Sequence, residues 1–169
     1  GGREVHRRLG LAHVRVAVLV DRGFARREFP RDAAGLALEL AQAKALAVSR
    51  QDADAWVLGA DQTLGFDGGL VSKAASLGEA RARLAAMRGK VHQLHSGAAL
   101  ARNGQIVWSG LDTASLRMRG FSDSFLDAYL TAEGEALLAC VGSYRLEGMG
   151  AQLFEAVDGD YFTVLGLPL

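Results

Sequence analysis

Three charged residues in the first half of the chain have the types and spacing for chemistry on a polyphosphate. Asp61 follows the apolar segment AWVLGA (55–60), Lys73 lies twelve residues later beyond the turn signal DGG (67–69), and Lys44 precedes both. Ammonium groups offset the charge of phosphate oxygens, while a carboxylate holds a divalent metal or accepts a proton from water. The three residues therefore predict a polyphosphate site if the fold brings them together.

A β-hairpin is expected to bring Lys73 back toward Asp61. If Phe66 pairs with Leu70 across the DGG turn, Thr63 lies opposite Lys73, close to the end of the buried strand that carries Asp61. The alternative is an exposed ion pair, which is worth only about 0–1 kcal/mol.

Lys44 lies on one stripe of the helix that is expected over 33–49. The other members of the stripe are Leu36, Leu40 and Val48, at intervals of four residues. A lysine in an apolar stripe either extends along it to water or points into a cavity that holds an anion. Periodicity alone leaves both alternatives open.

The rest of the sequence alternates between helical and strand patterns, which indicates a mixed α/β fold. Helices are expected over 4–9, 33–49 after the N-cap Asp32, 77–87 after the N-cap Ser76, 123–130 after the N-cap Ser122, and 133–139. Strands are expected over 13–20, 55–60, 63–66, 70–73, 90–102 and 105–118, with a final hairpin of 153–157 and 161–166.

The composition bounds the possible partners and compartment. The 169 residues are 50% apolar and 22% charged, with 19 Lys plus Arg against 19 Asp plus Glu. This balance provides no bulk field for a nucleic acid polymer or an anionic membrane. No apolar run reaches the roughly 20 residues of a membrane helix. Cys140 is the only cysteine, which excludes an internal disulfide and favours a reducing compartment.

Other chemically capable side chains have simpler structural explanations. His92 and His95 are three apart on an expected strand, so they face opposite sides and do not form a metal pair. Cys140 is expected to be a small core residue. Four aromatic residues are interpreted as core rather than as platforms for a base, namely Trp108, Tyr144, Phe154 and Phe162.

Several of these motifs together resemble the Maf family of nucleoside triphosphate pyrophosphatases. The similar segments are VLGADQTL, VSK, GEARARLAAMRGKVHQLHSGAALAR and EGMGAQLFEAVDGDYFTVLGLPL. The resemblance implies one domain over 1–169, with an elongated, bent mixed sheet flanked by helices and two lobes around a deep cleft. It also implies hydrolysis of a nucleoside triphosphate to the monophosphate and pyrophosphate, with Mg²⁺ or Mn²⁺, by a cytoplasmic and often dimeric protein.

The resemblance also assigns roles to individual residues. The family's catalytic aspartate falls on Asp61, which is also the expected metal ligand, and its active-site lysines fall on Lys44 and Lys73. Arg3 aligns with an arginine of the family's N-terminal phosphate-binding motif. The base-side glutamine of the family is replaced by Glu147, which accepts hydrogen bonds but lacks the amide donors.

Two departures from the family pattern suggest alternative functions. The chain begins GGREVHRRLG, without the family's S-x-S-P-R-R serines, and is predicted to lack the first strand and the C-terminal helix. Arg22 occupies the place of a metal-associated glutamate, although Asp21 adjoins it. One alternative is a nucleotide-binding protein with weak or lost turnover. Another is a structural partner in cell division, which leaves Lys44 and the Asp61–Lys73 hairpin unexplained.

Overall fold

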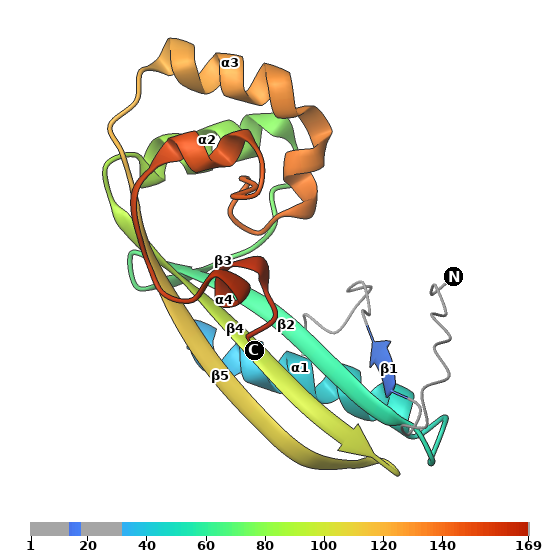
Figure 1. Ribbon diagram of the computed structural model, residues 1–169. Coiled ribbons are helices and arrows are strands. Elements are labelled where there is room, and N and C mark those ends of the chain that lie inside the picture. Colours follow the sequence, from blue (N-terminus) through green and yellow to red (C-terminus); the bar gives the residue numbers. More distant parts are fainter. Residues whose placement is uncertain (1–13, 18–31, 169) are drawn as a thin grey trace.

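A computed structural model describes residues 14–17 and 32–168 of the chain (Figure 1). Its elements are β1 (Val14–Ala17), α1 (Ala33–Ser49), β2 (Trp56–Phe66), β3 (Gly69–Val71), α2 (Leu77–Met87), β4 (Val91–Arg102), β5 (Gln105–Met118), α3 (Asp123–Glu133), the 3₁₀ helices η1 (Gly134–Ala139) and η2 (Met149–Leu153), β6 (Phe154–Asp158) and α4 (Tyr161–Leu165). The helix expected over 4–9, Arg3, Asp21 and Arg22 lie outside the described residues.

The described strands form one mixed sheet in the order β1-β2-β4-β5-β6, with β3 paired to β2. β1 runs parallel to β2, whereas every other pairing is antiparallel. The long β4–β5 hairpin turns at Asn103 and Gly104, whose φ angles of 50° and 69° fit a type I′ turn. The mixed α/β fold with an elongated sheet is therefore confirmed, and Figure 1 shows the long strands running diagonally across the molecule.

Helix α1 lies very close to one face of the sheet because small residues line both surfaces. Its buried stripe is Ala33, Ala37, Ala41, Ala45 and Ser49. A Cβ on Gly97 of β4 would lie 2.6 Å from the Ala37 carbonyl oxygen, so glycine is required there. The stripe that contains Lys44 lies beside this contact and is only half-buried.

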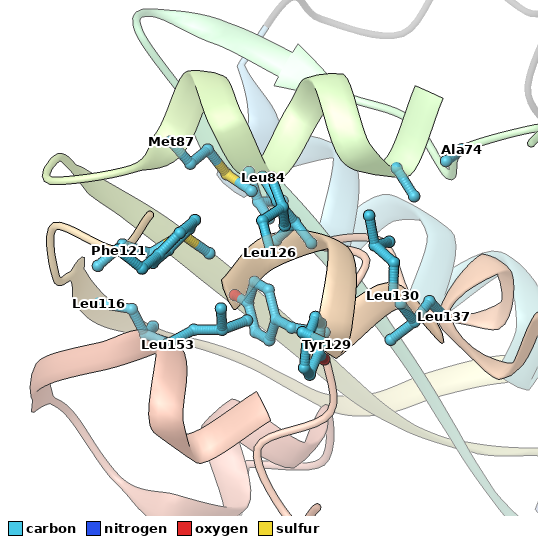
Figure 2. Close-up of a cluster of buried hydrophobic side chains, with 14 of the residues drawn as sticks. Ala74, Leu84, Met87, Leu116, Phe121, Leu126, Tyr129, Leu130, Leu137 and Leu153 are labelled. Atoms are coloured by element: carbon cyan, nitrogen blue, oxygen red, sulfur yellow. The ribbon is translucent and has the colours of Figure 1, made fainter. Parts of the chain in front are cut away.

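The main hydrophobic cluster lies at the other end of the sheet. It packs helices α2, α3 and η1 against the strand ends, as Figure 2 shows. Leu84 and Met87 of α2 meet Leu126 of α3, and Leu116 of β5 lies below them; all four are fully buried. Helix α1 and the group of α2, α3 and η1 therefore cover different parts of the sheet. The number of lobes and the depth of the cleft stay predictions.

The hairpin register differs by one residue from the predicted register. β2 is a single strand across Asp61, and the turn uses only Asp67 and Gly68, with φ angles of 54° and 76°. Two residues with positive φ complete a type I′ turn, so Phe66 pairs with Gly69 rather than with Leu70. The predicted pairing of Thr63 opposite Lys73 is therefore wrong, because β3 ends before Lys73.

The final predicted hairpin is also wrong, because YFTVLG forms helix α4. The Asp160 carboxylate accepts hydrogen bonds from the amides of Phe162 (2.8 Å) and Thr163 (3.3 Å), which makes it an N-cap. Gly166, with φ of 95°, closes the other end. The preceding strand β6 pairs with β5 instead, Val157 opposite Leu116.

The aromatic residues divide between core and surface. Tyr144 is buried and its ring meets Phe154 edge-on, with centroids 4.8 Å apart. Trp108 is 53% exposed and Phe162 is 47% exposed, so the prediction of core positions for these two is wrong. No helix among the described residues is long and apolar enough to cross a bilayer.

Candidate active site

A cavity of about 340 Å³ brings together four of the predicted site residues, Lys44, Asp61, Lys73 and Glu147. They come from α1, β2, the loop after β3, and the segment between η1 and η2. Gln62, Cys140 and Tyr144 also line the cavity, together with the end of α4. The fold thus places in one cavity residues that span more than one hundred positions of the chain.

The middle of β2 contributes Ala60, Asp61 and Gln62 to the cavity. β1 pairs with β2 as far as Gly59, and β3 pairs with it from Leu64 onward. Asp61 lies between these two pairings, although its other neighbour is Gly97 of β4. Asp61 therefore lies in the middle of a strand and not, as the sequence suggested, at a strand end.

Lys44 forms the closest charged contact in the cavity. Its Nζ lies 2.5 Å from Oδ1 of Asp61 and donates to the carbonyl oxygen of Ala60 at 3.3 Å. The side chains of Lys44 and Asp61 are 16% and 21% exposed. Of the two alternatives for Lys44, the structure thus selects the cavity. An ion pair at this depth is screened less by salt than a surface pair.

Lys73 and Glu147 are the other charged residues in the described part of the lining. Lys73 contributes a second ammonium group, so the predicted proximity of Lys73 to Asp61 is confirmed at the level of a shared cavity, despite the changed register. Glu147 is exposed, and its Oε1 accepts a hydrogen bond from Nε of Arg145 at 3.3 Å. The described residues therefore give the cavity two cations and two carboxylates.

The remaining lining is mostly apolar and includes residues that the sequence did not identify. Leu94, Val141 and Leu146 contribute aliphatic surface beside Tyr144. Cys140 is half-buried in this wall rather than in the core, and burial raises the pKa of its thiol. No spacing signal in the sequence connects these residues to Asp61, because Leu94 lies on β4 and the others follow the irregular segment around η1. The cavity thus combines a charged part with an apolar part suited to a nucleobase.

His92 and His95 have separate hydrogen-bond partners, as expected. Nε2 of His92 lies 2.7 Å from the Tyr144 hydroxyl, and Nδ1 of His95 lies 2.9 Å from the Thr113 hydroxyl. Ser96 likewise has a structural partner, since its Oγ donates to the carbonyl oxygen of Thr163. The structural interpretation of His92 and His95 is confirmed.

Burial of His92 predicts a specific loss of stability at mildly acidic pH. Burial lowers the pKa of His92 to about 4, whereas an unfolded histidine titrates near 6.5. Between these values the unfolded chain binds more protons, so the contribution is complete above about pH 6.5 and is lost as the pH falls toward 4. The expected contribution to unfolding free energy falls by about 2 kcal/mol between pH 7.5 and pH 5.

Urea unfolding of the wild type and of His92→Gln at both pH values measures this contribution. Glutamine keeps a hydrogen-bonding group beside Tyr144 but does not titrate. The drop in unfolding free energy should be about 2 kcal/mol smaller in His92→Gln than in the wild type. Equal drops in the two proteins would show that His92 is not the titrating group.

Comparison with known proteins identifies the family of the chain. The model of the Maf-like protein family matches residues 4–169. A nucleoside triphosphate pyrophosphatase of Maricaulis maris is 56% identical over 140 residues, which cover 83% of this chain and 70% of that protein. A 7-methyl-GTP pyrophosphatase of Rhizobium meliloti is 42% identical over 166 residues, covering 95% of this chain and 82% of that protein. The chain therefore belongs to the Maf family.

Proposed function

We propose that this protein hydrolyses a nucleoside triphosphate to the nucleoside monophosphate and pyrophosphate. The observation that carries the proposal is that Asp61, paired with Lys44, and Lys73 line one cavity. Relatives that bear the names nucleoside triphosphate pyrophosphatase and 7-methyl-GTP pyrophosphatase support the same reaction class.

The proposed reaction is a displacement at the α-phosphorus. Water forms the new bond to this phosphorus while the bond to the oxygen that bridges the α- and β-phosphates breaks, so pyrophosphate leaves. Asp61 orients the water and accepts its proton, and Lys44 and Lys73 stabilise negative charge on the leaving pyrophosphate. Arg3, outside the described residues, is proposed as a further phosphate ligand.

Mg²⁺ or Mn²⁺ is the proposed cofactor, with Asp61 as its protein ligand. Among the described residues no group of three or more His, Cys, Asp or Glu side chains could hold a metal. This donor set fits a cation that binds through one or two carboxylates and the phosphates of the substrate, as Mg²⁺ often does. When bound, the cation would neutralise phosphate charge.

The base preference is part of the proposal and has two candidates. The apolar wall around Tyr144 offers a surface for a base, and Glu147 offers a hydrogen-bond acceptor at the same cavity. One branch of the family is expected to favour dTTP and UTP, and another to favour 7-methyl-GTP. Both kinds of triphosphate therefore belong in the substrate panel.

Pyrophosphate release by the purified chain tests the proposal. Turnover with Mg²⁺ or Mn²⁺ is expected for at least one of dTTP, UTP and 7-methyl-GTP, and EDTA should reduce it by at least about a hundredfold because phosphate charge is no longer neutralised. Restoring excess Mg²⁺ should restore the rate. Saturable nucleotide binding without turnover for any triphosphate would instead favour the nucleotide-binding alternative, for which the comparisons provide no support.

Two further expectations stay predictions about the whole protein. A homodimer, implied by the family resemblance, is tested by sedimentation equilibrium. A cytoplasmic location is tested by fractionation of cells that express the protein. Neither is needed for the chemistry at Asp61.

A further inference from the structure

A row of polar side chains crosses the sheet next to Asp61. Gln62 of β2 pairs with Ser96 of β4, and Ser96 pairs with Asp112 of β5. Because side chains alternate along a strand, this row faces away from the side of the sheet that carries Asp61 and α1. All three members of the row hydrogen-bond to helix α4.

Thr163 is the point of α4 at which these hydrogen bonds converge. Its carbonyl oxygen accepts from Oγ of Ser96 at 2.6 Å and from Nε2 of Gln62 at 2.9 Å. Its hydroxyl donates to Oδ2 of Asp112 at 2.6 Å. Nε2 of Gln62 also donates to the Val164 carbonyl oxygen at 3.0 Å. Thr163 and Ser96 are fully buried, so the hydrogen bond between them is shielded from water, whereas the bonds to Gln62 and Asp112 are partly buried.

Helix α4 depends on such contacts for its position. It has only five residues, and isolated helices shorter than about 12 residues are marginal in water. Tyr161, Phe162 and Leu165 are exposed, which leaves Thr163 and Val164 as its buried residues. The end of α4, Val164 to Gly166, nevertheless lines the cavity that contains Asp61.

We infer that Thr163, through its hydrogen bond to Asp112, is a positioning residue that places the α4 wall of the nucleotide cavity. The inference rests on the proposed function for its kinetic consequences. The wall can contact a bound nucleotide, whereas Asp61 and Lys44 are held by β2 and α1 and do not depend on α4. Loss of the wall should therefore weaken ground-state and transition-state binding equally, which raises KM and leaves kcat unchanged.

Steady-state kinetics of two Thr163 variants test this placement. Thr163→Val removes the hydroxyl and keeps the shape and the backbone acceptor, so KM should rise about tenfold with kcat within about threefold of the wild type. Thr163→Ser keeps the hydroxyl and should restore KM to within about twofold. The matched control is Thr131→Val, because the Thr131 hydroxyl donates to a backbone oxygen within α3, at 2.8 Å from the Asp127 carbonyl oxygen.

Asp112→Ala tests the same hydrogen bond from the sheet. Asp112 is exposed, so this variant should fold even if Thr163→Val does not. Its KM should match that of Thr163→Val. The KM of the double variant, Thr163→Val with Asp112→Ala, should be no higher than that of either single variant, because all three variants lack the same Thr163–Asp112 hydrogen bond. An unchanged KM in Asp112→Ala, or multiplying effects in the double variant, would overturn the inference.

Hydrogen exchange separates failure of this inference from failure of the proposed function. The amides of Val164, Gly166 and Leu167 are bonded within α4 and its C-terminal turn. They should exchange at least about tenfold faster in Asp112→Ala than in the wild type. If the wild type hydrolyses no nucleotide, the proposed function fails. Faster exchange in Asp112→Ala would still support the positioning of α4 by the Thr163–Asp112 hydrogen bond. Unchanged exchange would overturn it.

Discussion

Asp61→Asn should lower kcat for nucleoside triphosphate hydrolysis by about a thousandfold, the range expected when a general base is lost. Asparagine has nearly the same shape, but it cannot accept the water proton and is a poorer ligand for a divalent cation. It also leaves the Lys44 ammonium, 2.5 Å away, without its ionic partner. Pyrophosphate release at saturating substrate measures the loss.

The matched control for this variant is Asp67→Asn. Asp67 is exposed in the β2–β3 turn with φ of 54°, a conformation that asparagine also tolerates. Asp67→Asn makes the same chemical change outside the cavity. It should leave kcat within about twofold of the wild type, since surface substitutions have small effects. If a folded Asp61→Asn keeps more than about a tenth of wild-type kcat, Asp61 is not the group that activates water.

Gly97→Ala should destabilise the fold by about 3 kcal/mol, the upper part of the range for overpacking. The new Cβ would lie 2.6 Å from the Ala37 carbonyl oxygen and 2.8 Å from the Leu38 Cα. Both are backbone atoms of α1, so relief requires movement of the whole helix away from the sheet. Lys44 is part of α1, so its Nζ should move away from Asp61 with the helix. We therefore expect kcat to fall as well. Urea unfolding and kinetics measure the two effects.

Gly120→Ala is the matched control for this steric argument. A Cβ on Gly120 meets nothing within 4 Å, and its φ lies outside the left-handed region. Its unfolding free energy should therefore stay within about 0.5 kcal/mol of the wild type. Equal stability of Gly97→Ala and Gly120→Ala would contradict the close packing of α1 on β4.

The sequence predicted those elements whose ends have local chemical signals. Asp32, Ser76 and Ser122 accept hydrogen bonds from amides of the first helical turn, so α1, α2 and α3 begin where expected. Asn103 and Gly104 likewise predicted the long β4–β5 hairpin. Such signals act within a few residues and need no tertiary contact.

The errors arose where one motif permits two structures or where packing decides. The segment DGD at 158–160 contains both a hairpin turn signal and a helix N-cap, and the contacts of Thr163 with the sheet favour the helix. Asp61, Lys44 and Lys73 were identifiable from charge and spacing, with the family resemblance as support. Gln62 was not, because its role depends on Ser96 and α4, which are distant in sequence.

Hydrolysis in ¹⁸O-labelled water tests the central claim most directly. One turnover of the preferred triphosphate should put a single ¹⁸O atom in the nucleoside monophosphate and none in the pyrophosphate, because water attacks the α-phosphorus. Mass spectrometry of both products measures the label. Label in pyrophosphate, or in orthophosphate released beside a nucleoside diphosphate, would place the attack at another phosphorus and contradict the proposed reaction.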